Sequence, residues 1–295
     1  IVSKLKIKKF KNIINKSKKE LDLRNSIKVD NFFRKKKINY VILAAAKVGG
    51  ILANSKYGAE FLTENLQIQT NVISCSQKYK VKNLIFLGSS CIYPKFSKQP
   101  IKEEYLLTGK LEPTNEAYAI AKIAGLKMCE NFNNQYKTNY KCLMPSNLFG
   151  PNDNYNLDNS HFLPAMIKKL YQAKITNKKE VIFWGTGRPK REMTYVDEIA
   201  DACIFFLNKR TKHTLINIGS GFEKSIKEFA ELIAKELRLN IHIRFNNNKS
   251  LDGTPRKIVD SKIAKSYGWR PKYKFLEYLK LCLNDYATNY QKYKS

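Results

Sequence analysis

Two short segments of the chain carry side chains that could act on a carbonyl group. Ser89 and Cys91 follow the apolar run 84–87, while Tyr118 and Lys122 lie four residues apart in a stretch of helical spacing. That spacing places the phenol and the ammonium on one face of a helix, one turn apart. A nearby ammonium favours the phenolate, so Tyr118 could give a proton to a developing alkoxide near neutral pH. The Ser89 hydroxyl could donate a hydrogen bond to the same oxygen.

Each of these features is a weak signal when it is taken alone. The chain contains 17 tyrosines among many lysines, so a few Tyr-x-x-x-Lys matches arise by chance. A surface tyrosine beside a surface lysine explains an isolated match equally well, and the Gly-Ser-Ser around Ser89 could be a plain turn. The combination of a strand end with the helix that follows it is what indicates carbonyl chemistry.

The first half of the chain alternates between apolar runs of strand length and stretches of helical spacing. Strands are expected at 38–46, 84–87 and 140–144, and helices at 60–79 and 117–136. This alternation predicts an α/β fold with a doubly wound, Rossmann-like parallel sheet. Ligands of such sheets bind at the carboxyl ends of the strands. Residues 44–49, 89–91 and 145–147 are placed there.

The alternation loosens after Gly150-Pro151, where a polar loop is expected at 152–160 because Asn and Asp favour turns. Helices are then expected at 163–173, 196–207, 226–237 and 273–293, and strands at 181–184 and 215–218. We therefore predict two interleaved units. The first is a Rossmann-like domain of residues 1–150 with about 187–219, and the second is a smaller α/β substrate-binding domain of residues 151–186 and 220–295.

The bulk composition argues against some classes of protein. The 295 residues carry a formal net charge of +29, with 54 Lys and Arg against 25 Asp and Glu. The cations are mostly lysines spread along the whole chain, and no DNA- or RNA-binding motif occurs, so we expect no nucleic-acid partner. No apolar run approaches the ~18 residues of a membrane span, so we expect no membrane partner.

Six cysteines lie apart from one another, at positions 75, 91, 129, 142, 203 and 282. No C-x-x-C pair occurs among them, so neither a metal site nor a redox pair is expected. Dispersed, unpaired cysteines are typical of the reducing cytoplasm, where we place the protein.

The motifs in their βαβ setting resemble a known superfamily. Ser89, Tyr118 and Lys122 resemble the catalytic triad of the short-chain dehydrogenases/reductases, and the Asn-x-x-Tyr-Ala-x-x-Lys pattern resembles their extended branch. Longer stretches are similar to the GDP-L-fucose synthase family: LAAAKVGGILAN, FLGSSCIYPK, QPIKEEYLLTGKLEPTNEAYAIAKIAGLKMCE, MPSNLFGPNDNYN, SHFLPA and DGTPRK. The resemblance covers nearly the whole chain. It implies 3,5-epimerisation and NADPH-dependent 4-reduction of GDP-4-keto-6-deoxy-D-mannose.

The resemblance assigns catalytic roles to Ser89, Tyr118 and Lys122 and makes Cys91 and His161 a pair of proton-transfer residues. The chemistry agrees, because protons on carbons beside a ketone are acidic and inverting such carbons needs a base on one face and an acid on the other. A thiol and an imidazole both have ordinary pKa values near enough to neutral to serve. Taken singly, Cys91 could be a small buried apolar residue and His161 a surface histidine.

Substrate contacts also follow from the resemblance. The matching residues are Asn147, Lys169, Trp184, Arg191 and Lys257. Trp184 could stack on a guanine, and Arg191 could pair with a diphosphate. The family usually has an arginine where Lys169 stands, so the charge is kept but the bidentate geometry is not.

The cofactor side is where the chain departs from the family. No G-x-x-G-x-x-G occurs, and residues 2–10 resemble the later part of the first helix. We therefore expect that the first strand and its Gly-rich loop are missing, as in a fragment or a sequence with a misplaced start. The residues that match the family's NADP(H)-binding positions are Lys16, Lys18, Asp22, Leu23, Ala44, Ala45, Ala46, Tyr118 and Lys122. Lys16 and Lys18 could equally belong to a lysine-rich turn.

We therefore expect a cytoplasmic enzyme that acts on a GDP-sugar and pairs as a homodimer through the Tyr-Lys helix, near Leu126, Met128 and Phe132. Two alternatives stay open at this point. One is another nucleotide-sugar epimerase or dehydratase of the same branch, which would need neither Cys91 nor His161. The other is an inactive remnant that binds a nucleotide sugar or a partner, and the missing glycine loop is its only support.

Overall fold

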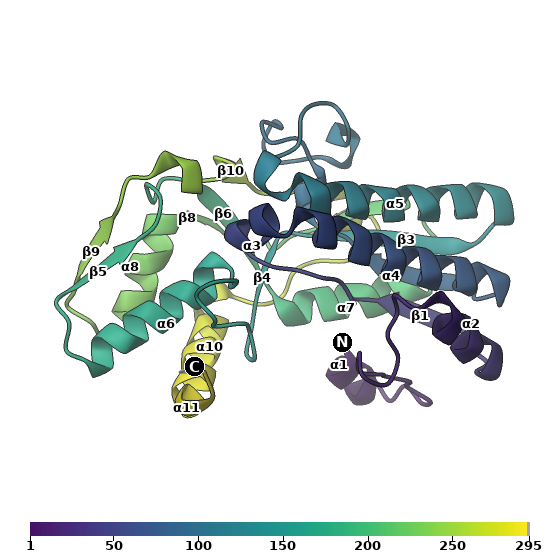
Figure 1. Cartoon of the computed structure of the whole chain (residues 1–295), viewed down its shortest axis with the longest axis horizontal. Coiled ribbons are helices and arrows are strands. Elements are labelled where there is room, and N and C mark those ends of the chain that lie inside the picture. Colours follow the sequence, from purple (N-terminus) through teal and green to yellow (C-terminus); the bar gives the residue numbers. More distant parts are fainter. Residues whose placement is uncertain (294–295) are drawn as a thin grey trace.

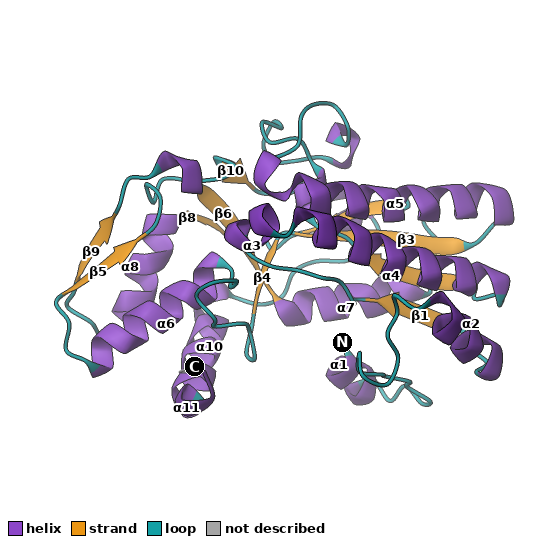
Figure 2. Ribbon diagram, in the orientation of Figure 1, coloured by secondary structure: helices purple, strands orange, loops and turns teal. Residues whose placement is uncertain are grey.

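The computed structural model describes residues 1–293 and contains a four-stranded parallel sheet flanked by helices (Figures 1 and 2). Its strand order is β1 (Tyr40–Leu43), β2 (Asn83–Leu87), β3 (Asn139–Pro145) and β7 (Leu215–Ile218). Helix α4 (Gly58–Lys78) connects β1 to β2, and α5 (Glu116–Tyr136) connects β2 to β3. The predicted α/β class with a doubly wound parallel sheet is confirmed.

Helices cover both faces of this sheet, which is why its strands are mostly apolar. Helices α4 and α5 pack on one face with α2 (Ser26–Lys35), around side chains such as Leu84 and Phe86. Helix α7 (Val196–Leu207) and the short α9 (Lys262–Ser266) cover the other face, around Ile85 and Leu143. Helix α1 (Val2–Ile7) lies against α7, and its Lys4 ammonium lies 3.3 Å from Asp197.

Strand β1 forms one edge of the described sheet, and it is shorter than the predicted strand 38–46. Its pairing with β2 ends at Leu43, opposite Phe86, so the residues on either side are not held in a ladder. Tyr40 is 45% exposed at this edge, whereas Leu84 on the neighbouring strand is fully buried.

A second unit is built around strand β6 (Lys190–Tyr195). It pairs in parallel with β4 (Asn147–Phe149) and β10 (Arg256–Lys257), and antiparallel with β8 (Glu223–Ser225). A separate parallel pair consists of β5 (Glu180–Phe183) and β9 (His242–Phe245). The chain crosses between the units several times, and the exact domain bounds stay a prediction. Strands β4, β6, β8, β9 and β10 were not predicted, and three of them, β4, β8 and β10, have only two or three residues, which is too short to show a period.

Helices α6 (Phe162–Ile175), α8 (Ile226–Glu236) and α10 (Phe275–Thr288) share one apolar cluster in this second unit. Helix α8 begins with a capping box, in which the Ser225 hydroxyl and the Glu228 carboxylate each accept from the other's backbone N–H. The remaining helices are α3 (Ile51–Lys56) and α11 (Tyr290–Tyr293). In residues 1–293, we find no helix with the length and apolarity that crossing a membrane requires.

Helices α4 and α5 lie side by side across the sheet (Figure 1), and Gly125 permits their close approach. A Cβ on Gly125 would lie 2.7 Å from Cζ of Phe86 and 2.9 Å from Cδ of Gln69. The buried Gln69 amide cannot easily retreat, because it donates to a backbone carbonyl of α5 at 2.6 Å. Tyr118 and Lys122 lie on the same helix, so this contact also fixes their position.

We expect Gly125→Ala to lower the free energy of unfolding by about 1–3 kcal/mol through overpacking. This outweighs the roughly 0.5–1 kcal/mol by which alanine favours a helix over glycine. Gly58→Ala is the matched control, because its added methyl would meet nothing closer than the Ala117 Cβ at 3.7 Å. Urea unfolding measures both variants. A Gly125→Ala protein as stable as the wild type would show that the helices do not need this close contact.

Candidate active site

A cleft of about 880 Å³ opens at the carboxyl ends of the parallel sheet, with the second unit forming its other wall. All ten predicted catalytic and substrate-binding residues line it: Ser89, Cys91, Tyr118, Lys122, His161, Asn147, Lys169, Trp184, Arg191 and Lys257. They come from segments that are far apart in the sequence. The structure therefore brings the predicted proton-transfer residues and the predicted substrate contacts into one cavity.

Ser89 and Cys91 are positioned by the turn that ends β2. The Ser89 hydroxyl accepts from the backbone N–H of Cys91 at 3.3 Å and caps the 3₁₀ turn Ser90–Ile92. Gly88 is required just before it, because a Cβ there would overlap the Met144 side chain of β3. The close passage of these two strand ends therefore places the hydroxyl and the thiol at the cleft.

Lys122 is held between α5 and the end of β2. Its side chain is buried, and its ammonium donates to the Leu87 carbonyl at 2.8 Å and lies 5.7 Å from the centre of the Tyr118 ring. Burial lowers the pKa of Lys122 to about 8. The ammonium is therefore directed at the strand end as well as toward the phenol.

The pKa of Tyr118 differs from the sequence-based expectation. Burial of the phenol and the nearby Cys91 raise its pKa well above the ordinary value, and the hydrogen bond with Ser89 offsets only part of that rise. The expected lowering by Lys122 was wrong for the protein without ligands, because desolvation of the phenolate outweighs the attraction of an ammonium already bound to a carbonyl. Tyr118 thus keeps its proton at neutral pH.

The Cys91 sulfur accepts from two donors. The Lys257 ammonium lies 3.4 Å from Sγ, and the Asn115 amide nitrogen lies 3.5 Å from it. Burial alone would raise the pKa of Cys91, but Lys257, the Ser89 hydrogen bond and the Arg191 charge together lower it below its ordinary value. The thiolate therefore forms more easily here than on a free cysteine.

His161 lies at the cleft wall, immediately before α6. The loop that carries it is tied to the start of α3, where the Gly50 N–H donates to the Asn159 carbonyl at 3.1 Å. A Cβ on Gly50 would lie 2.7 Å from the Ser160 carbonyl oxygen, so only glycine permits this approach. Desolvation and the charge of Lys257 lower the pKa of His161. The imidazole is therefore neutral at neutral pH.

The predicted substrate contacts bring three positive charges, those of Lys169, Arg191 and Lys257, to the cleft. Lys257 and Arg191 are register partners on β10 and β6, and Arg191 donates to the Asp252 carbonyl at 2.9 Å. Lys169 lies over Trp184, with its ammonium 5.2 Å from the ring centre. Among residues 1–293, no carboxylate forms an ion pair with any of these three cations. Uncompensated cations in a cleft suit an anionic ligand such as a diphosphate.

The residues matched to the cofactor site divide into two groups. Ala44 and Ala46 line the cleft beside Tyr118 and Lys122, where small side chains leave room for a flat ring. This end of the cleft fits a nicotinamide. The others, Lys16, Lys18, Asp22, Leu23 and Ala45, are not among the residues that line the cleft.

The charged residues of that second group have local partners. Lys16 pairs with Glu20 at 2.8 Å, Lys18 lies 3.9 Å from Glu64, and Asp22 accepts from Arg24 at 2.7 Å. These contacts fit the alternative of a lysine-rich turn as well as a phosphate site. Their role toward a cofactor stays a prediction.

Several polar residues of the cleft were missed by the sequence-based reasoning. Four of their oxygens are shielded from solvent and have no partner among the described residues: Asn54 Oδ1, Thr114 Oγ1, Asn115 Oδ1 and Ser160 Oγ. A buried oxygen without a partner is costly unless a ligand supplies a donor. Asn115 could have been found from its place three residues before Tyr118. The other three carry no signal, because polar residues are common in loops.

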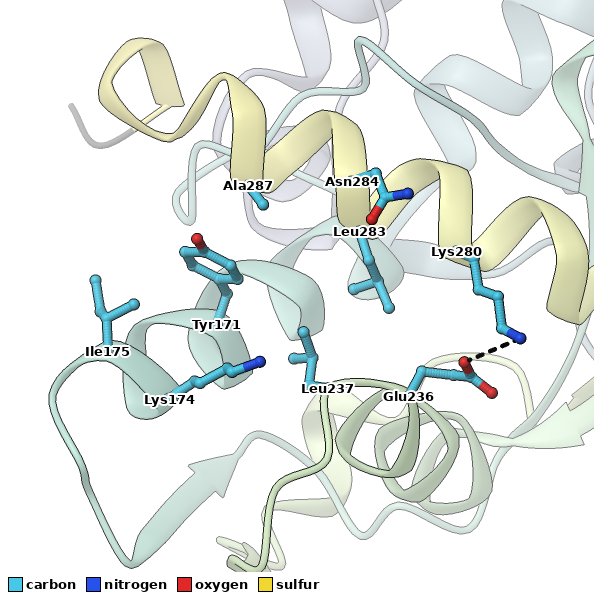
Figure 3. A pocket seen from close by; sticks show the side chains of 9 residues that line it. All are labelled: Tyr171, Lys174, Ile175, Glu236, Leu237, Lys280, Leu283, Asn284 and Ala287. Atoms are coloured by element: carbon cyan, nitrogen blue, oxygen red, sulfur yellow. Dashed lines mark ion pairs between the residues drawn. The ribbon is translucent and has the colours of Figure 1, made fainter.

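A smaller pocket of about 310 Å³ lies elsewhere, between α6, the end of α8 and α10 (Figure 3). Tyr171, Leu237 and Leu283 line it, and Lys280 pairs with Glu236 across its rim at 3.7 Å. It contains none of the residues singled out from the sequence. The large cleft is therefore the candidate active site.

Comparison with known proteins shows the family to which the chain belongs. Residues 4–219 match the NAD dependent epimerase/dehydratase family. The chain is 49% identical over 289 residues to GDP-L-fucose synthase 1 of Arabidopsis thaliana, which covers 98% of this chain and 89% of that protein. It is 44% identical over 266 residues to GDP-L-fucose synthase of Escherichia coli (strain K12), with 87% and 83% covered.

A solved structure is similar over the whole described fold. The GDP-L-fucose synthetase from Naegleria fowleri bound to NADP superposes with a TM-score of 0.89 at 26% identity, covering 100% of this chain and 90% of that one. The chain therefore belongs to the NAD dependent epimerase/dehydratase family and, within it, to the group of the GDP-L-fucose synthases.

Proposed function

We propose that this protein makes GDP-L-fucose by 3,5-epimerisation and NADPH-dependent 4-reduction of GDP-4-keto-6-deoxy-D-mannose. One observation carries the proposal: Cys91 and His161 share a cleft with Ser89, Tyr118 and Lys122. Hydride transfer to a ketone requires only the last three. Two further acid–base groups suit a reaction that also inverts the carbons beside the ketone, and the named relatives support this assignment.

The epimerisation uses the proton-handling residues. One of Cys91 and His161 removes a proton from a carbon beside the ketone, and the electron pair of that C–H bond moves into the enolate. Ser89 and Tyr118 donate hydrogen bonds to the enolate oxygen. The other residue returns a proton on the opposite face, which inverts the carbon. The two donors on Cys91 Sγ favour Cys91 for the first step.

The reduction uses Tyr118 as the acid. NADPH, when bound, supplies the hydride that the ketone carbon receives. Tyr118 gives its proton to the resulting alkoxide, and its raised pKa means that the proton is available at neutral pH. The Lys122 ammonium places a positive charge near the Tyr118 phenol. Lys122 also lies beside the part of the cleft that suits a nicotinamide.

The substrate's GDP group would occupy the electropositive wall. Arg191 and Lys257 lie side by side there, and half-exposed Trp184 offers a flat surface for the guanine. The sugar hydroxyls would supply donors to the unpartnered oxygens of Asn54, Asn115 and Ser160. NADP(H) as the cofactor is supported by the NADP-bound relative from Naegleria fowleri.

A homodimer in the cytoplasm completes the proposal. Helix α5 offers Ile120, which is 45% exposed, together with the half-buried Met128 and Phe132. Leu126 must be withdrawn from the expected contact, because it is fully buried against the sheet and cannot reach a partner. The six free cysteines suit a reducing compartment.

Product formation tests the function directly. Incubation with GDP-4-keto-6-deoxy-D-mannose and NADPH should yield GDP-L-fucose on chromatography. Cys91→Ser and His161→Gln should each slow this conversion by about 10²–10⁴-fold, which is typical for loss of a general acid or base. Both should still oxidise NADPH readily when they are given the 3,5-epimerised ketone. Equal loss on both substrates would count against their role in epimerisation.

Tyr118→Phe should impair the reduction itself. We expect NADPH oxidation with the epimerised ketone to fall by about 10²–10⁴-fold, because the alkoxide loses its proton donor. Tyr136→Phe is the matched control, since Tyr136 ends the same helix and is 47% exposed. Stopped-flow absorbance of NADPH measures both. Near-normal turnover by Tyr118→Phe would remove Tyr118 from the reduction step.

A further inference from the structure

Cys91 has surroundings that none of the other five cysteines has. Those five are buried, whereas Cys91 is partly accessible at the cleft. Its sulfur accepts from the Lys257 ammonium at 3.4 Å and from the Asn115 amide at 3.5 Å. Cationic and amide donors around a sulfur favour the thiolate, which is the reactive form of a cysteine.

Lys257 itself lacks an obvious counter-ion. It is 9% exposed, and no carboxylate within residues 1–293 lies in ion-pair distance of its ammonium. Its side chain makes one hydrogen bond in this part of the chain, and that bond goes to Cys91. A buried ammonium is costly unless an anion compensates it. The Cys91 sulfur is the hydrogen-bond partner of this ammonium, and as a thiolate it would supply the compensating negative charge.

The backbone of Lys257 is fixed on both sides. The Gln99 amide donates to the Arg256 carbonyl at 3.0 Å and accepts from the Ile258 N–H at 3.0 Å. The buried Glu192 carboxylate then accepts from the Val259 N–H at 3.0 Å. The backbone of short strand β10 is thus held at each end, and the Lys257 ammonium is held by its contact with Cys91.

Asn115 is fixed as well. It ends the 3₁₀ turn Pro113–Asn115, whose Thr114 N–H donates to the Glu112 carboxylate at 3.1 Å. Glu112 is itself buried and paired with Lys95 at 2.9 Å. The amide of Asn115 therefore approaches Cys91 from the α5 side, while Lys257 approaches it from the second unit.

We propose that Lys257 and Asn115 hold Cys91 as a preformed thiolate, which makes Lys257 a positioning residue for proton transfer as well as a substrate contact. The catalytic meaning of this pair rests on the proposed function. The other groups that face the pair do not oppose it. Arg191 adds a positive charge from β6, Tyr118 keeps its proton, and the protonation of His161 is disfavoured by Lys257.

Alkylation of Cys91 tests the thiolate without substrate or cofactor. The rate of modification by iodoacetamide would be followed by peptide mass spectrometry across a pH series. We expect Cys91 in the Lys257→Met variant to react about tenfold more slowly at pH 7, and the midpoint of its rate–pH profile to move to higher pH. One opposite charge typically moves a pKa by about one unit or more. Lys257→Arg should restore most of the rate.

Lys262→Met is the matched control, because its side chain is 86% exposed and lies on the same segment, so it removes one positive charge without changing the site. Its alkylation profile should equal that of the wild type. Asn115→Ala gives a second, independent variant and should shift the midpoint upward by less than Lys257→Met does. If Lys257→Met shows the same alkylation profile as the wild type, the proposal is overturned. If Lys257→Met does not fold, an unchanged profile in Asn115→Ala overturns it.

GDP binding separates the two roles of Lys257. If Lys257 serves only the diphosphate, calorimetry would show weaker GDP binding in Lys257→Met while the alkylation profile stays unchanged, and the proposal would be overturned. The proposed function can fail separately. A wild-type protein that forms no GDP-L-fucose, but whose alkylation midpoint still shifts in Lys257→Met, would refute that function and support the thiolate pair.

Discussion

The site depends on the buried Lys122 ammonium, which binds α5 to the end of β2. It donates to the Leu87 carbonyl at 2.8 Å and lies 4.7 Å from the centre of the Phe86 ring. Burying an ammonium is costly, and the lowered pKa of about 8 reflects that cost. The hydrogen bond holds the helix in the register that sets Tyr118 beside Ser89 and Cys91. The close packing of Gly125 against the same Phe86 ring and against Gln69 also supports this helix.

The second unit supplies Arg191 and Lys257 to the cleft, whereas the first supplies Ser89, Cys91, Tyr118 and Lys122. Arg191 and Lys257 are register partners on β6 and β10. A net charge of +29 alone gave no guide to function, because the lysines are spread along the chain. What matters is that these two buried or half-buried cations have no carboxylate among the described residues to neutralise them. One face of the cleft can therefore hold a diphosphate, and it can also stabilise a thiolate.

Local spacing and strand ends were enough to predict part of this site. Tyr118 and Lys122 are separated by one helical turn, and Ser89 follows a strand, so their meeting follows from the parallel topology. The predicted helix 196–207 and strand 215–218 match α7 and β7, since the first is a long apolar-faced stretch and the second a short, mostly apolar run.

The rest of the site could not be predicted, since it depends on contacts between distant residues. Asn115 and Lys257 reach Cys91 from 24 and 166 residues away, and Lys257 lies on a two-residue strand with no pattern of its own. The direction of the Tyr118 pKa was wrong because desolvation cannot be read from neighbouring letters. Leu126 was misplaced because an apolar residue on a helix can face either the sheet or a partner.

The central claim is that one cleft both inverts carbons beside the ketone and reduces the ketone. The most direct measurement is turnover of GDP-4-keto-6-deoxy-D-mannose with unlabelled NADPH in D₂O, followed by NMR of the product. Our account predicts solvent deuterium on carbons 3 and 5 and a hydrogen from NADPH on carbon 4. A reduced product that carries no solvent deuterium on carbons 3 and 5 would contradict it.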